Sequence, residues 1–141
     1  MGRDIRPRIF NVNTQSDVIK FILERVDEII DDRANYHFVD IGAGGGFVTS
    51  KVSGFASTKG YEITKGEDFF DIPAIADPTI YYMFNPFAAR DTARLNAHLR
   101  DASGYLVYYD AQWTKLLNKN SFKKVYEKLI VGGKFEIYEI I

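Results

Sequence analysis

Four glycines within five positions are the feature of this sequence that most restricts its fold. They lie in the segment Asp40-Ile41-Gly42-Ala43-Gly44-Gly45-Gly46-Phe47, after a short apolar run, YHFVDI. Glycine weakens helices and strands, so such a cluster indicates a backbone that must turn sharply or contact a ligand. We therefore predict a buried strand, a glycine turn and a helix whose N-terminal amide groups can bind an anion.

The rest of the chain alternates short apolar runs with amphipathic segments. Hydrophobic periodicity predicts helices over 16–32, 47–54 and 88–102, with Gly54 and Gly104 closing the last two. It predicts strands over 36–41, 59–63, 79–84 and 104–110. Residues 64–78 contain Gly66, Pro73 and Pro78, and are predicted to be loop with at most one helical turn. This alternation is typical of an α/β fold with a parallel sheet.

The C-terminal segment admits two interpretations. Residues 122–131 and 134–141 flank Gly132-Gly133, which predicts a hairpin that adds an antiparallel edge to the sheet. The alternative is a helix over 121–130 that ends in a glycine cap. We favour the hairpin because FEIYEII is rich in residues that favour strands. Residues 112–119 are predicted to be helical.

Composition limits the class of protein. The chain has 141 residues, a net charge of -1 and no cysteine, which predicts one domain over 1–141 and excludes disulfides and a polybasic character. Within it, 1–13 is predicted to be an arm and 14–34 to hold the N-terminal helix. No apolar run is long enough to cross a membrane, so a cytoplasmic protein without membrane contact is expected. His37 and His98 lack ligand spacing, and no metal site is predicted.

The spacing of the glycines indicates which class of ligand such a turn could bind. A dinucleotide fingerprint, G-x-G-x-x-G, would place a glycine where Phe47 stands, and a phosphate-binding loop would need a lysine that is missing. The pattern is instead D-x-G-x-G-x-G, from Asp40 to Gly46. A nicotinamide- or flavin-binding domain therefore remains only as a less favoured interpretation.

The segments FVDIGAGGGFVTSKVSG, KGYEI and YYMFNPF together resemble class I S-adenosylmethionine-dependent methyltransferases. The resemblance covers roughly 14–141 and implies a Rossmann-like three-layer sandwich with a mostly parallel sheet and a C-terminal antiparallel hairpin. It implies that S-adenosyl-L-methionine is the cofactor. The residues that would bind it are Asp40, Gly42, Ala43, Gly44, Gly46, Glu62 and Asp68.

The resemblance also implies individual roles. Glu62, 22 residues after Asp40, would hold the ribose hydroxyls, as a carboxylate can accept two hydroxyl donors. Asp68, or else Asp71, would bind the adenine amino group. Phe69 or Phe70 would pack on the adenine ring, unless both belong to the core.

Asn85-Pro86-Phe87 ends a predicted strand and resembles the fourth motif of amino-group methyltransferases, with one proline where the commonest form has two. The resemblance implies that Asn85, Pro86 and Phe87 are the catalytic residues. Tyr81 or Tyr82 would wall the pocket, and Asp110 would take a proton. The alternative is that Asn-Pro only ends the strand, that Phe87 lies in the core, and that Asp110 caps a turn.

The resulting hypothesis is a methyltransferase that acts on an amino group of a macromolecular acceptor, either protein or nucleic acid. The alternative is a catalytically inactive module that binds the cofactor or a nucleotide, as a subunit of a larger complex. Only 16 residues separate Glu62 from Thr79, so the sheet is predicted to be shortened here and to lose an edge strand. An exposed sheet edge would allow homo-oligomers. The lysines over 115–128 form either a solvated face or a basic patch for nucleic acid.

Overall fold

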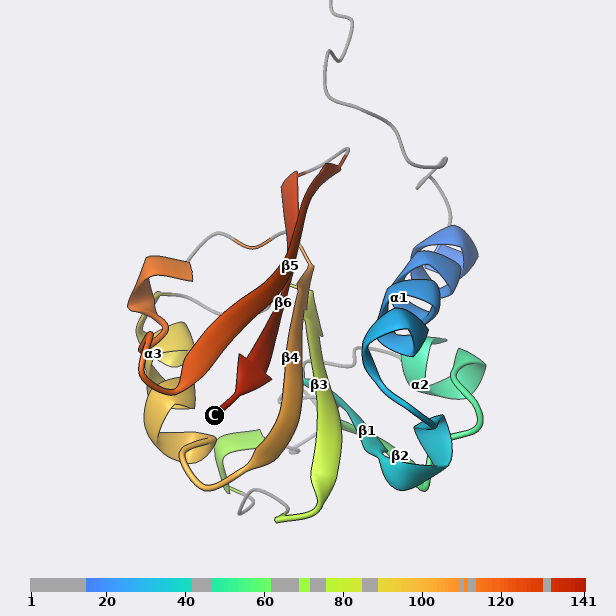
Figure 1. The fold of residues 1–141 in the computed structure, drawn as a ribbon, viewed down its shortest axis with the longest axis horizontal. Coiled ribbons are helices and arrows are strands. Elements are labelled where there is room, and N and C mark those ends of the chain that lie inside the picture. Colours follow the sequence, from blue (N-terminus) through green and yellow to red (C-terminus); the bar gives the residue numbers. More distant parts are fainter. Residues whose placement is uncertain are drawn as a thin grey trace, which may run out of the picture.

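Six strands form one sheet at the centre of the molecule, with helices on both of its faces (Figure 1). The structure is a computed structural model that describes residues 15–41, 47–61, 69–71, 76–84, 89–109, 111, 114–130 and 133–141. The helices are α1 (Gln15–Ile29), η1 (Arg33–Asn35), α2 (Phe47–Lys51), η3 (Phe69–Asp71), α3 (Ala89–His98) and η4 (Thr114–Leu116). The strands are β1 (His37–Ile41), β2 (Ser57–Tyr61), β3 (Pro78–Phe84), β4 (Ser103–Tyr109), β5 (Phe122–Ile130) and β6 (Gly133–Ile140).

The strand order is β2-β1-β3-β4-β6-β5. The pairs β1–β2, β1–β3 and β3–β4 are parallel, whereas β6 runs antiparallel to both β4 and β5. The predicted α/β fold with a mostly parallel sheet and a C-terminal hairpin is thereby confirmed. The alternative helix over 121–130 is wrong, because these residues pair with β6 from Phe122 to Ile130.

Each face of the sheet carries its own hydrophobic core, because neighbouring residues of a strand point to opposite faces. Phe38 faces α1 and α2, and the core there includes Phe21, whose ring packs edge-on against Phe135 at 4.9 Å. Val39 and Ile41 face α3 and η3, together with Leu95 of α3. The layer formed by α1 and α2 and the layer formed by α3 lie on opposite sides of the sheet in Figure 1.

Several predicted boundaries are wrong by a few residues. β2 spans 57–61 rather than 59–63, and its first three residues are exposed, so no apolar pattern marks its start. α2 ends at Lys51, before Gly54, which has a φ of +86° in the turn that follows. α3 ends at His98, so Gly104 does not close it but lies inside β4. A helix was predicted over 112–119. The described part of this range contains only the short 3-10 helix η4.

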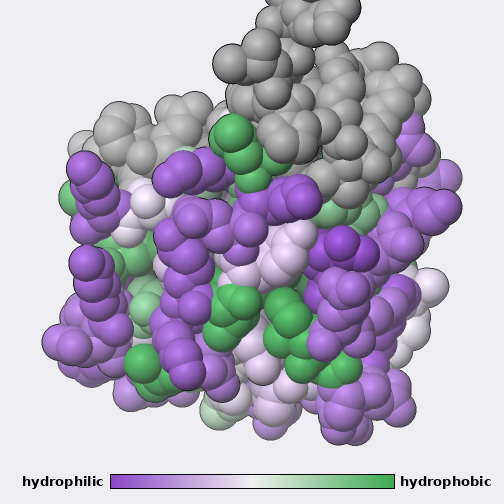
Figure 2. Space-filling model, turned by 45° about the horizontal axis from the view of Figure 1, so that its top comes forward, coloured by the Kyte–Doolittle hydropathy of each residue, from purple (hydrophilic) through white to green (hydrophobic). Residues whose placement is uncertain are grey.

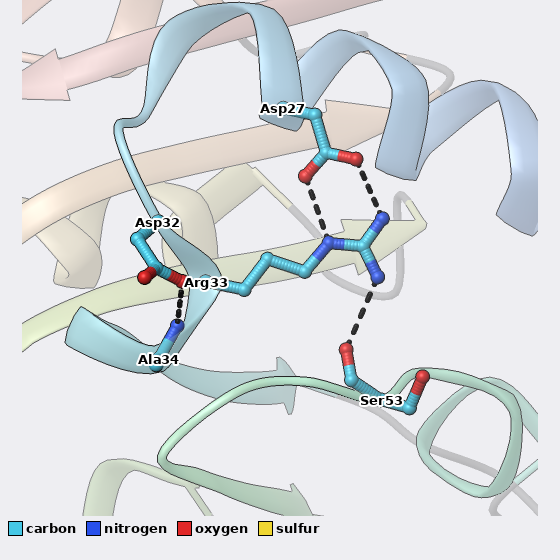
Figure 3. A network of polar contacts seen from close by, with 5 residues as sticks. All are labelled: Asp27, Asp32, Arg33, Ala34 and Ser53. Atoms are coloured by element: carbon cyan, nitrogen blue, oxygen red, sulfur yellow. Dashed lines mark hydrogen bonds and ion pairs between the residues drawn. The ribbon is translucent and has the colours of Figure 1, made fainter.

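Arg33 connects the helical layer that covers β1 (Figure 3). Its guanidinium donates to both carboxylate oxygens of Asp27 on α1, at 2.8 and 2.6 Å, and to the main-chain oxygen of Ser53 at 3.1 Å. Asp32 caps η1 by accepting from the amide of Ala34 at 2.9 Å. The end of α1 and the turn after α2 are therefore joined just before the chain enters β1.

The outer surface is mostly hydrophilic. On the face shown in Figure 2, hydrophobic side chains form separate small patches among hydrophilic ones. The exposed large hydrophobic residues among those described are Leu116, Val125, Leu129 and Ile141. No helix in the described ranges is both long and apolar enough to span a membrane.

Candidate functional site

Four parallel strands end at the same edge of the sheet. β1 ends at Ile41, β2 at Tyr61, β3 at Phe84 and β4 at Tyr109. The chain passes from β1 outward to β2 and then returns to β3 on the other side of β1, so the strand order reverses between β1 and β3. In open α/β sheets, ligands bind outside the carboxyl ends of the strands at such a switch point. This edge is therefore the candidate site.

Most of the predicted site residues lie outside the described residues. In the sequence, Gly42, Ala43, Gly44 and Gly46 come after the end of β1, Glu62 and Asp68 after the end of β2, and Asn85, Pro86 and Phe87 after the end of β3. Asp110, which follows β4, also lies outside. Of the seven residues predicted to bind the cofactor, Asp40 is the one that the structure describes. Asp71, the alternative to Asp68, is the last residue of the 3-10 helix η3.

Asp40 is a buried carboxylate at the switch point. It is 3% exposed and pairs with Gly60 of β2 and Tyr82 of β3, on the face covered by α1 and α2. Burial raises the pKa of Tyr82, and the negative charges of Asp40 and then of Tyr109 raise it further. Gly60 adds no side chain beside Asp40, so the carboxylate lies next to a phenol that stays protonated at neutral pH.

Tyr81 and Tyr82, the predicted pocket walls, are both core residues. Tyr82 packs with Phe38 on the α1 face, with ring centroids 6.3 Å apart. Tyr81 packs with Phe69 on the α3 face, at 6.0 Å. Because they point to opposite faces, the two phenols cannot wall the same pocket.

Phe69 and Phe70 of η3 differ in their surroundings. Phe69 is buried, with His98 at 4.6 Å and Tyr61 at 5.7 Å between ring centroids, so it fits the interpretation as core. Phe70 is partly buried and lies 4.1 Å below the guanidinium of Arg94. The 3-10 helix η3 thus covers the α3 face of the sheet in the shortened segment between β2 and β3.

Sequence reasoning missed a buried charged group on β6. The side chain of Glu136 is fully buried, and it contacts Tyr138 on the same strand and Lys124 on β5. Strict alternation in FEIYEII places Glu136 and Tyr138 on the face opposite to Phe135 and Ile137, but it does not tell whether that face is covered.

The predicted lysine patch is divided between the two faces of β5. Lys124 pairs in register with Tyr138, and therefore lies on the α3 face. Lys128 pairs with Phe135 and lies on the opposite face. Trp113 lies outside the described residues. The lysines therefore do not form one continuous surface with a common orientation.

Two further polar features lie away from the carboxyl edge. At the start of the parallel strands, the Nδ1 of His37 lies 2.5 Å from the Oγ of Ser57, and its Nε2 lies 3.6 Å from an oxygen of Asp77. An open pocket of about 330 Å³ lies between α1, η1 and α2, and is lined by Ile19, Lys20, Leu23, Glu24, Arg33 and Lys51. No group of three metal-ligating side chains occurs in the described part of the chain.

No protein-family model matches the sequence, and no curated protein matches it significantly. The site is therefore interpreted from its own residues and from the resemblance of the motifs.

Proposed function

We propose that the protein is an S-adenosylmethionine-dependent methyltransferase that acts on an amino group of a macromolecule. The observation that carries the proposal is the order of the strands. The motifs resembling the family follow β1, β2 and β3 in the sequence, and these strands end at one edge on both sides of the switch point. The strands that precede three motifs far apart in the sequence therefore end next to one another.

The finer description of the fold belongs to the same proposal. A parallel sheet that is completed by a C-terminal antiparallel hairpin and covered on both faces is what the resemblance implies. Within the described residues, β2 is an edge strand and η3 is the helical element between β2 and β3, as expected for a shortened variant. We therefore propose a Rossmann-like three-layer sandwich.

The chemistry of the carboxylates fits the proposed cofactor. Its donor groups are two ribose hydroxyls, an adenine amino group and an ammonium, and carboxylates accept hydrogen bonds from all of them. The buried carboxylate of Asp40 lies at the switch point. Asp40, Glu62 and Asp68 would hold these donors, and the glycines of 42–46 would allow close approach to the main chain. When bound, the cofactor supplies a methyl group on a positively charged sulfur.

The remaining residues would position the acceptor. The side-chain oxygen of Asn85 and the main-chain oxygen of Pro86 would accept hydrogen bonds from the amine and direct its lone pair toward the methyl group. Phe87 would exclude water from the reacting atoms. Asp110, next to the end of β4, would receive the proton that the amine loses.

Calorimetric titration with S-adenosylhomocysteine tests the proposal. We expect micromolar binding to the wild-type protein, loss of binding in Glu62→Ala, and no comparable binding of NAD. Absence of S-adenosylhomocysteine binding would refute the proposal, and preferential binding of NAD would favour a nicotinamide-binding domain instead.

Transfer of a radiolabelled methyl group to mixed protein and RNA then distinguishes the enzyme from an inactive module. Cofactor binding without transfer would favour the module. A cytoplasmic location and homo-oligomers formed through an exposed edge, β2 or β5, stay predictions.

A further inference from the structure

The strand β5 forms one edge of the sheet. It is the last strand in the order β2-β1-β3-β4-β6-β5, and its nine residues make it the longest of the six (Figure 1). Every second residue of an edge strand directs its amide and carbonyl groups away from the neighbouring strand. Between Lys123 and Ile130, no described residue forms a main-chain hydrogen bond with that outer side of β5. The edge can therefore accept a further strand.

The sequence of this edge is basic. Residues 111–126 contain four lysines and no acidic residue. Within β5, Lys124 forms ion pairs with Glu127 and with a buried glutamate of β6. Lys123 and Lys128 are exposed, and neither forms an ion pair with a described residue. Two cations of the edge strand are thus available to a partner.

These two lysines lie on one face of the sheet. Lys128 pairs in register with Phe135, a core residue of the face covered by α1. Lys123 pairs with Glu139, which lies on the same face because its neighbour Tyr138 belongs to the α3 face. The β-bulge in β5 allows two lysines five positions apart to share that face.

The other side of the same edge presents apolar side chains. Leu129 follows Lys128 in the strand and therefore points to the α3 face. It is 43% exposed, and Val125 at the bulge is 40% exposed. All the exposed large hydrophobic residues among those described lie within 116–141. The edge thus combines cations on one face of the sheet with exposed apolar surface at the bulge and on the other face.

We infer that the outer edge of β5 binds an extended acidic segment of a partner protein, which joins the sheet as a further strand. The side chains of an added strand alternate between the two faces, and its main chain pairs with the edge. Carboxylates at every second position lie beside Lys123 and Lys128, and the apolar side chains between them lie beside Leu129. The inference does not depend on the proposed methyltransferase activity.

Other occupants satisfy fewer of these groups. Two β5 strands side by side would bring together three lysines and one glutamate from each copy, and like charges on paired strands are destabilising. Lysines and bulges are typical means by which edges avoid pairing with a second copy. A nucleic acid has no main-chain amides to pair with the edge. An acidic strand pairs with the main chain, neutralises the lysines and covers the apolar side chains.

Fluorescence anisotropy tests the inference with a labelled peptide as long as β5, made of alternating glutamate and valine. The wild type should bind it at least about tenfold more tightly than the same peptide with lysine in place of glutamate. Lys123→Gln combined with Lys128→Gln should weaken binding about fivefold, because exposed ion pairs are individually weak. Lys20→Gln combined with Lys59→Gln is the matched control, since it removes the same charge from α1 and from the other edge strand, β2. It should leave the affinity unchanged.

A peptide that is N-methylated on every amide tests the pairing of main chains. It keeps the charges and the side chains but has no main-chain donor for the edge, so it should not bind measurably. Equal binding of the methylated and unmethylated peptides would mean that charge alone holds the peptide, and would overturn the inference.

Amide hydrogen exchange, followed residue by residue by NMR, locates the bound peptide. The glutamate peptide should slow exchange within 123–130 and leave residues 57–61 of β2 unchanged. Three results would overturn the inference: slower exchange at β2 instead of β5, exchange at β5 that slows with protein concentration alone, or tighter binding of a single-stranded oligonucleotide than of the peptide. They would point to the other edge, to a second copy of the chain and to a nucleic acid, respectively.

Discussion

Gly104 of β4 lies directly against the main chain of Thr79 on β3. A Cβ atom on Gly104 would be 1.9 Å from the carbonyl oxygen of Thr79 and 2.6 Å from its nitrogen. Gly104 also has a φ of +120°, a conformation that other residues rarely adopt. The two residues are register partners in the parallel pair β3–β4, and Thr79 is fully buried. This contact allows the two central strands to pair from their first residues.

We expect Gly104→Ala to lower the free energy of unfolding by about 3 kcal/mol or more, because a clash with main chain adds to backbone strain. Urea denaturation followed by circular dichroism measures the change. Gly54→Ala is the control, since Gly54 also has a positive φ, +86°, but its nearest atom is 3.4 Å away, on the flexible side chain of Arg33. It should cost about 1 kcal/mol. Equal losses in the two variants would contradict the close contact.

The contrast between Gly42–Gly46 and Gly104 shows what the sequence can predict. Strand β1 was predictable because its apolar run and the glycines after it are local features. The partner of Gly104 is 25 positions away in the sequence, so its local context only suggested a helix end, and that prediction was wrong. Contacts between strands that are distant in the sequence leave no local periodicity.

The strand ends at the candidate site were predictable to a similar degree, whereas its residues stay predictions. Its motifs were found because each directly follows a strand, and the strand order then brings three strand ends together. Glu136 was missed because a glutamate in a β-rich segment is ordinarily assigned to the solvent side. Only the second covered face of the sheet, whose core includes Leu95 of α3, makes that position buried.

Arg33 is expected to stabilise the junction of α1, α2 and β1 through the shape of its guanidinium. Arg33→Met should lower the free energy of unfolding by about 1 kcal/mol, a modest value because both partners in the ion pair are partly exposed. Arg33→Lys keeps the charge but cannot form the two parallel bonds to Asp27, and should lose nearly as much. Urea denaturation measures both variants. Wild-type stability of Arg33→Lys would mean that charge alone matters here.

Stability is expected to fall steeply above about pH 10, the ordinary pKa of a tyrosine. Burial, followed by nearby negative charge, raises the pKa of Tyr82, and burial followed by the hydrogen bond to Glu136 raises that of Tyr138. Below pH 10 both phenols are protonated in the folded and the unfolded chain, so they add no pH dependence. Above it, the unfolded chain loses these protons and the folded chain keeps them. Each tyrosine then lowers stability by about 1.4 kcal/mol per pH unit.

Denaturation at several alkaline pH values measures this slope, while absorbance near 295 nm follows the ionisation of the phenols. Tyr82→Phe should remove about 1.4 kcal/mol per pH unit from the slope, whereas Tyr138 and the other tyrosines with a raised pKa, Tyr36 and Tyr105, still contribute. If Tyr82 ionised near pH 10 in the folded protein, its burial in the core beneath α1 would be contradicted.

Asp40 is expected to support cofactor binding through its charge rather than through its volume. Asp40→Asn keeps the size of the side chain at a position that is 3% exposed, so the fold should persist. Loss of a buried carboxylate that accepts hydrogen bonds should weaken binding of S-adenosylhomocysteine at least about tenfold in calorimetry. Asp77→Asn is the matched control, because Asp77 precedes β3 at the opposite edge of the sheet and is mostly exposed. If both variants bound like the wild type, the carboxylate at the switch point would have no part in cofactor binding, and the proposed site would rest on Glu62, Asp68 and the glycines.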